Sequence, residues 1–273
     1  MQSSQRVGVR LGSFALVLAG TFGTAYAIGE RLPGHNHSSG SGPTHDDHSP
    51  GDAGSPMVPG FEMNGHQLVT GHMHGDGATF HMVGPSGEAV TDYAMAHGAL
   101  LHVIVIRPDL SEFQHVHPTI GSDGTWTVPI TGPGQWHLVF ESTPVIDGTP
   151  VAQPIIVTAN IDDETVIDTV PLPPADDSVE IDGLQVTRNG FGFVVTNADD
   201  GAATDLEPYL EQVAHLVAIR QGDLAFSHLH PLASPAGTFD FGDGVSEPGT
   251  YRLFLQFGHA GSVVTVAFTV VIP

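Results

Sequence analysis

Leu100–Pro118 reads LLHVIVIRPDLSEFQHVHP, and the pattern returns at Val213–Pro231 as VAHLVAIRQGDLAFSHLHP. The histidines of the motif recur 113 residues later, and their spacing is the same in both copies. These six histidines are His102, His115 and His117 in the first copy and His215, His228 and His230 in the second. The repetition predicts two domains of the same fold, each built around one copy.

Each copy has the pattern of a β-hairpin. The aliphatic run Leu101–Ile106 and the shorter run Phe113–His117 indicate strands, and Pro108–Ser111 between them consists of turn-forming residues. A four-residue loop pairs Ile104 with His115 and His102 with His117. Since side chains alternate along a strand, the three histidines then share one face of the hairpin.

Three neutral imidazoles on adjacent strands are a suitable ligand set for Cu(II) or Zn(II). We therefore predict one metal site in each copy, with copper as the expected metal and zinc as the other possibility. The alternative is that these histidines are structural and only hydrogen-bond neighbouring turns. A single HxH motif favours that alternative, whereas two copies of a three-histidine set favour metal.

The composition predicts an all-β protein that does not bind nucleic acid. Of 273 residues, 34 are glycine and 21 are proline, and they separate many short Val/Ile/Thr runs. There are 30 acidic residues against 7 arginines, and the resulting net charge of −23 repels nucleic acid and favours cations as partners. The absence of cysteine excludes disulfides, thiolate zinc sites and blue-copper centres.

The N-terminal residues indicate export. In residues 1–29, two arginines precede an apolar run that ends near Ala25-Tyr26-Ala27, which is typical of a signal peptide or an uncleaved membrane anchor. Residues 30–60 are rich in Gly, Ser, Pro and His and predict a disordered linker that can collect metal ions loosely. We expect the rest of the chain to lie outside the cytoplasm, with any membrane contact made through residues 1–29.

Two domains should follow, at residues 61–160 and 179–273, joined by an acidic, Pro-rich linker at 161–178. The first contains further candidate ligands, and their combination of thioether and imidazole is what Cu(I) accepts, so the expected copper is Cu(II) or Cu(I). Residues 71–77 around three of these candidates look like a loop. The secondary candidates are His72, Met73, His74, His81 and His97. Met82 and Phe80 instead fit alternate core positions. If only one site binds tightly, the histidine content favours the first domain. In the second domain, Glu207–Val213 is compatible with a short helix.

The motifs DLSEFQHVHP and HLVAIRQGDLAFSHLHP resemble those of exported actinobacterial proteins with a tandem HxHP arrangement. The resemblance covers about residues 61–273 and is specific at the hairpins. More distantly, the chain is similar to YtkA-like and periplasmic copper-resistance modules. This resemblance implies two tandem Ig-like β-sandwich domains and suggests metal handling. The lack of cysteine departs from electron-transfer cupredoxins, so that function is not carried over.

Three classes of function compete. The first is a non-enzymatic extracytoplasmic metal-binding protein for buffering, delivery or resistance. The second is an envelope structural or protein-interaction module, in which the histidines would be hydrogen-bonded to main chain and buried apart from one another. The third is a cupin-type metalloenzyme, but Pro118–Gly121 follows the first HxH motif without the carboxylate expected there. We therefore expect no enzymatic activity.

Overall fold

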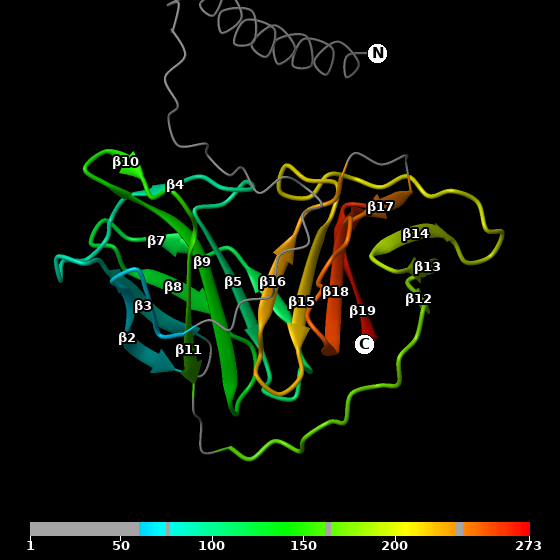
Figure 1. Cartoon of the computed structure of the whole chain (residues 1–273), viewed down its shortest axis with the longest axis horizontal. Helices are drawn as coiled ribbons and strands as arrows, with labels where there is room; N and C mark the ends of the chain where they lie inside the picture. Colours follow the sequence, from blue (N-terminus) through cyan, green and yellow to red (C-terminus); the bar gives the residue numbers. More distant parts are fainter. Residues whose placement is uncertain (1–59, 75–76, 162–164, 233–236) are drawn as a thin grey trace, which may run out of the picture. The chain divides into compact units, whose positions relative to one another are not determined.

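The computed structural model describes residues 60–74, 77–161, 165–232 and 237–273. The described residues all fall within one compact unit, His45–Pro273. They form strands, turns and loops (Figure 1). The part of the chain described contains no helix that is long and apolar enough to cross a membrane.

Two sheets come from the first half of the chain. One has the order β1-β2-β3-β8-β7, and the other has the order β10-β9-β5-β6, with β4 and β11 also paired to β9. The strands of the first sheet are β1 (Glu62–Met63), β2 (His66–His74), β3 (Gly77–Val83), β7 (Thr119–Ile120) and β8 (Trp126–Pro129). Those of the second are β4 (Tyr93–Ala94), β5 (Leu101–Ile106), β6 (Gln114–Val116), β9 (Trp136–Ile146), β10 (Thr149–Pro150) and β11 (Ile155–Ile161).

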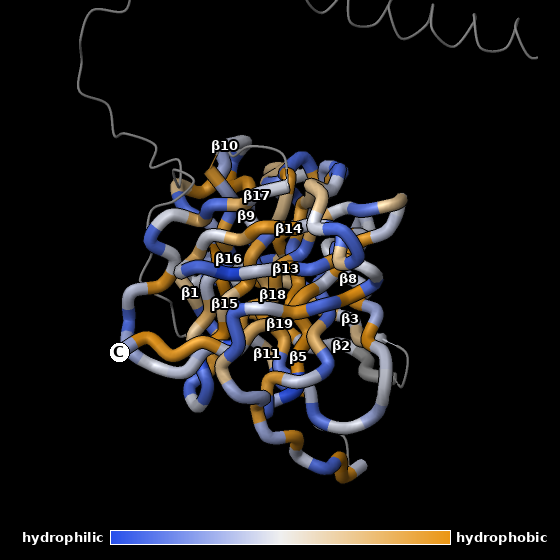
Figure 2. Tube along the Cα trace, turned by 90° about the vertical axis from the view of Figure 1, so that its right-hand side faces the viewer, coloured by the Kyte–Doolittle hydropathy of each residue, from blue (hydrophilic) through white to orange (hydrophobic). Residues whose placement is uncertain are grey.

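The second half repeats this plan with two four-stranded sheets, in the orders β12-β13-β14-β17 and β16-β15-β18-β19. Their strands are β12 (Ser178–Ile181), β13 (Leu184–Asn189), β14 (Gly192–Asn197), β15 (His215–Arg220), β16 (Phe226–Leu229), β17 (Thr238–Asp240), β18 (Gly249–His259) and β19 (Ser262–Ile272). Figure 2 shows apolar segments in orange near the middle of the view, where β18 lies. The all-β sandwich fold expected from the sequence is confirmed.

Each half has its own apolar core between its two sheets. Trp136 is a large member of the first core and Tyr251 of the second. The strand β5 sends alternate residues such as Val103 and Val105 into the first core. Burial of these side chains is the main stabilising contribution, at about 1.5–3 kcal/mol for each large aliphatic or aromatic residue.

A third core joins the two halves. All six residues of β5 are buried, because its other face, with Ile104 and Ile106, packs against Val217 and Ile219 of β15. The phenyl rings of Phe113 and Phe254 stack in the same core, with centroids 4.1 Å apart. The unbroken aliphatic run in β5 therefore reflects burial on both faces.

The hairpin register predicted from the sequence is confirmed, whereas the helix is wrong. Ile104 pairs with His115 in the β5–β6 ladder, and Val217 pairs with His228 in the β15–β16 ladder. Residues 207–213 instead form bridges and turns, in which Leu210 and Glu211 have positive φ angles of 50° and 63°. A right-handed helix excludes such angles.

Candidate metal centre

The first hairpin brings its three histidines together at the end of β5. The Nδ1 atom of His102 lies 3.2 Å from Nε2 of His115 and 3.1 Å from Nε2 of His117. The third side of this triangle, between Nε2 of His115 and Nε2 of His117, is also 3.2 Å. Three ring nitrogens therefore converge on one point, as the sequence predicted.

Hydrogen bonds on the far sides of two rings fix their tautomers. The Nε2 atom of His102 lies 3.0 Å from the carbonyl oxygen of Ala96, which can only accept, so this nitrogen carries the hydrogen. In the same way, Nδ1 of His115 donates to Oε1 of Gln256 at 2.8 Å. The nitrogens of His102 and His115 that face each other are therefore both lone-pair acceptors. One hydrogen on Nε2 of His117 can satisfy only one of them at a time.

The second hairpin repeats this arrangement. The Nε2 atom of His215 donates to the carbonyl oxygen of Tyr209 at 3.1 Å, and Nδ1 of His228 donates to Oε2 of Glu141 at 2.8 Å. Their remaining nitrogens face each other as lone pairs 3.1 Å apart. Nε2 of His230 is buried with no hydrogen-bond partner among the described residues. A buried polar atom without a partner costs about 1–3 kcal/mol.

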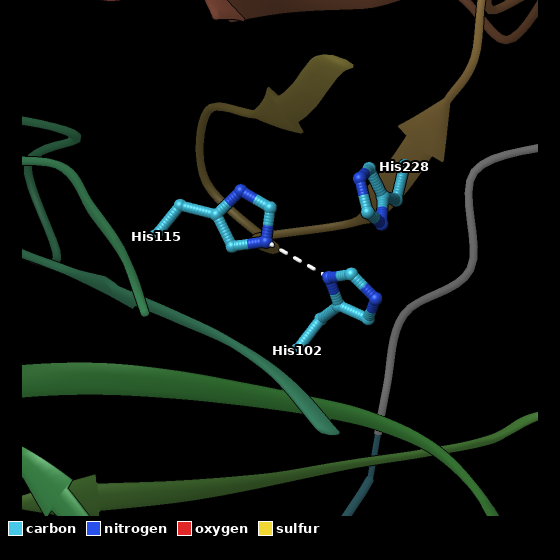
Figure 3. A group of neighbouring side chains, drawn as sticks. All are labelled: His102, His115 and His228. Carbon is cyan, nitrogen blue, oxygen red and sulfur yellow. Dashed lines mark hydrogen bonds between the residues drawn. The ribbon is translucent and has the colours of Figure 1, made fainter. Parts of the chain in front are cut away.

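The two triads form one cluster, whereas the sequence predicts a separate site in each copy. The ring of His228 lies 5.2 Å from the rings of both His102 and His115. Ligand nitrogens of His102, His115 and His228 lie within 4.8 Å of one another, as do those of His215, His228 and His230. We call the six motif histidines the histidine cluster. Figure 3 shows the histidines of the first of these two groups, with His228 coming from the other half of the chain.

A seventh histidine lies against the cluster. His97 is exposed, and its ring stacks on that of His230 with centroids 3.7 Å apart. It also lies 6.3 Å from the ring of His102. The sequence marked His97 as an extra candidate of the first domain, but its nearest ring contact is with the second repeat.

The cluster histidines are neutral at pH 7. Burial, with a smaller contribution from neighbouring histidines, lowers the pKa of His117 to about 4. Burial is also the main cause that lowers the pKa of His215 to about 4. The pKa values of His115 and His228 are lowered well below the usual range, first by burial and then by the charges of other histidines in the cluster. Neutral imidazole is the form that binds a metal.

The donor set fits a metal ion. In a tetrahedral zinc site with Zn–N bonds of about 2.0–2.1 Å, ligand nitrogens lie about 3.3–3.4 Å apart. The nitrogens of the first triad lie 3.1–3.2 Å apart, so a small outward movement of the rings would admit an ion. The hydrogen bonds from the far sides of these rings resemble the outer contacts that orient metal-bound histidines.

The remaining candidates lie elsewhere or cannot be placed. His81 is in β3, where it pairs with Val69 in the other sheet of the first half. Met82 is buried in the first core, as its alternation with Phe80 predicted. The side chains of His72, Met73 and His74 lie outside the described residues.

The expectation of a loop at residues 71–77 is wrong at residues 71–74, which belong to β2, and at Gly77, which begins β3, while residues 75–76 lie outside the described residues. The pairing of β2 with β3 shifts register between Thr70 and Met73, which accounts for the loop-like sequence of this part of the strand. Gly71 fits there because a Cβ atom at this position would meet the side chain of Thr79.

Sequence reasoning missed Glu141 and Gln256. They occupy equivalent places, since Glu141 pairs with His102 in the β5–β9 ladder and Gln256 pairs with His215 in the β15–β18 ladder. A polar residue within each apolar run, VFES in β9 and FLQF in β18, was the available signal. The carbonyl oxygens of Ala96 and Tyr209 leave no such signal, because any residue supplies a carbonyl.

A protein family described as a domain of unknown function (DUF8832) matches residues 179–273. No curated protein matches the sequence. Among solved structures, the BSP domain of a biofilm-associated protein is 15% identical, with a TM-score of 0.19, and the match covers 72% of this chain and 27% of that one. A DUF3823 family protein from Bacteroides uniformis is 14% identical, with a TM-score of 0.16 and coverages of 69% and 95%.

Proposed function

We propose that this protein is an extracytoplasmic metal-binding protein, for copper first and zinc second, that buffers, delivers or detoxifies the metal without catalysing a reaction. One observation carries the proposal: in each repeat, two histidine nitrogens face each other as lone pairs at 3.1–3.2 Å with no hydrogen between them. A shared cation removes this repulsion. A metal ion suits the site better than a proton, because burial disfavours the charged imidazole.

The choice of metal rests on the donor atoms. The cluster offers imidazole nitrogen alone, which suits Cu(II) and Zn(II), and Cu(II) ranks above Zn(II) in affinity for a given nitrogen site. Among the described methionines, Met63 contacts the backbone nitrogen of Ile156, Met82 is buried in the first core and Met95 is 63% exposed. None of these contacts strengthens the case for Cu(I), so Cu(II) is the form we put first.

The site of action follows from the N-terminal residues. The apolar run of residues 1–29 is a signal peptide or membrane anchor in this proposal, and residues 30–60 are a His-rich leader. The four histidines of that leader raise the metal concentration near the folded domains. A family relationship to the exported tandem HxHP proteins and, distantly, to the YtkA-like copper-resistance modules belongs to the same proposal.

The second candidate is an envelope structural or interaction module. It is favoured by two hydrogen bonds that cross between the repeats without any metal, from His115 to Gln256 and from His228 to Glu141. These bonds alone would help to hold the two repeats together. They do not account for the convergence of the opposite ring nitrogens, which a purely structural role does not require.

The test compares metal retention by full-length variants. The protein is freed of metal, loaded with Cu(II) or Zn(II), desalted and analysed for metal content. A variant with all six cluster histidines replaced by alanine should retain at least one equivalent less than the native chain. The matched control, His81→Ala, should retain the native amount. Equal retention by this six-histidine variant and the native chain would favour the structural module instead.

A further inference from the structure

The two repeats are similar around the histidine cluster, and two of the positions at which they differ bear on the binding of a cation. The first histidine of each HxH motif, His115 or His228, donates its Nδ1 hydrogen across to the other repeat, at 2.8 Å in both directions. Its acceptor is the carboxylate of Glu141 for His228, but the neutral amide of Gln256 for His115. The other difference is at position 97, where the second repeat has Leu210 in place of His97. Both differences concern the binding of a cation.

The carboxylate of Glu141 affects the basicity and the orientation of the His228 ring. The His228 side chain is 1% exposed and that of Glu141 is 19% exposed, so their hydrogen bond is only weakly screened by water. A carboxylate that accepts from a metal-binding imidazole raises the basicity of the coordinating nitrogen and holds the ring in place. It also offsets part of the charge of the ion. The amide of Gln256 orients His115 in the same way but carries no charge.

His97 adds a nitrogen-bearing ring to the same triad. It and Leu210 have nearly the same backbone conformation, with φ angles of 49° and 50°, so their side chains leave equivalent loops in equivalent directions. The ring of His97 stacks on His230 at 3.7 Å and lies 6.4 Å from His228. Leucine at position 210 offers the first triad no donor atom.

Because the two triads lie close together, the differences between them affect how two ions bind. Since ligand nitrogens of His102, His115 and His228 lie within 4.8 Å of one another, ions held by the two triads would be near neighbours in a buried site. Two divalent cations repel strongly there, and Glu141 is the carboxylate hydrogen-bonded to the histidine cluster. The carboxylate is hydrogen-bonded directly to His228 of the second triad, whereas its charge acts on His102 of the first triad without a hydrogen bond to it. The ion bound by His228 is therefore compensated most directly, and a second ion must bind against the charge of the first.

We propose that the triad His215–His228–His230, completed by Glu141 and His97 from the first repeat, fills first, and that the triad His102–His115–His117 binds a divalent ion later and more weakly. This inference rests on the proposed metal-binding function. It reverses the expectation from histidine content, which favoured the first domain. Glu141 acts here as a positioning residue through His228.

The experiment is a Cu(II) titration of the full-length protein against a competing chelator, which resolves a tight and a weak class of site. His230→Ala should abolish the tight class, whereas His117→Ala should leave it intact. Glu141→Gln, which keeps the hydrogen bond to His228, should weaken the tight class about 10- to 100-fold. The mirror variant Gln256→Glu should strengthen the weak class, and the double swap should bring the two classes together or invert their order.

The possible outcomes distinguish a failure of this order of filling from a failure of the proposed metal-binding function. Loss of the tight class in His117→Ala but not in His230→Ala overturns the order of filling and leaves metal binding in place. Unchanged affinities in Glu141→Gln overturn the role of the carboxylate. His97→Leu should weaken the tight class, and Leu210→His should strengthen the weak class. These variants test the same order of filling without altering a buried residue. A native chain whose metal content equals that of a variant lacking all six cluster histidines overturns both proposals.

Discussion

The tautomers of individual histidines explain why the cluster is suited to an ion. The carbonyl oxygens of Ala96 and Tyr209 take the Nε2 hydrogens of His102 and His215, and the side chains of Gln256 and Glu141 take the Nδ1 hydrogens of their two partners. Every one of these contacts turns a lone pair toward the centre of a triad. The cluster is therefore organised before any ion arrives, which lowers the cost of binding.

The lowered pKa values predict the pH dependence of the metal-free protein. Imidazoles of the unfolded chain titrate near 6.5, whereas those of His117 and His215 titrate at about 4 in the fold. Between these values the unfolded state binds more protons, so the free energy of unfolding falls as the pH falls through this window. Above pH 6.5 this contribution to stability is fully present. Urea unfolding at a series of pH values measures it.

The control for this prediction is a variant with His117 and His215 replaced by asparagine, which does not titrate. Its free energy of unfolding should depend less on pH in the same window. A pH dependence as steep as that of the native chain would contradict the assignment of the effect to these two histidines.

At the scale of elements, the hairpin could be predicted and the meeting of the two hairpins could not. The alternation in a strand and the turn residues at Pro108–Ser111 determine the register that pairs Ile104 with His115. No local pattern states which face of one repeat meets the other. The unbroken aliphatic run of β5 was the one indication, since it implies that a second layer covers the face that carries His102.

The third core positions the two triads, so weakening it should affect both stability and metal binding. Phe254 is 4% exposed and stacks on Phe113. Phe254→Ala should lower the free energy of unfolding by about 3–5 kcal/mol, as large-to-small core substitutions do, and should also weaken metal binding. Urea unfolding and metal titration measure the two effects.

The matched control is Phe193→Ala, which removes a phenyl ring that is 1% exposed and belongs to the core of the second half alone. This variant should lose similar stability but keep the native metal affinity as long as it is folded. Equal losses of affinity in the two variants would contradict a specific role for the core between the repeats.

At the scale of the whole molecule, a metal ion should act as a clamp between the repeats. Ligand atoms of His102 and His115 lie close to those of His228 from the other repeat, and the third core already joins the two. A ligand that binds the folded state alone stabilises it by about 2.7 kcal/mol at 100 times its Kd. Cu(II) should therefore raise the Tm of both repeats together, as followed by calorimetry.

A variant with all six cluster histidines replaced by asparagine provides the control for the clamp. Its Tm should not respond to Cu(II), even though the His-rich leader is still present. If Cu(II) stabilised only one of two separate transitions in the native chain, the ion would not be joining the repeats.

The central claim is that the histidine cluster binds a metal ion in a buried site through its imidazole nitrogens. X-ray absorption spectroscopy of the full-length protein, loaded with one equivalent of Cu(II) and desalted, tests it most directly. The account predicts a first shell that contains at least three imidazole nitrogens at about 2.0 Å, and the loss of that shell in the variant without the six cluster histidines. An oxygen-dominated shell, or the same imidazole shell in that variant, would contradict it.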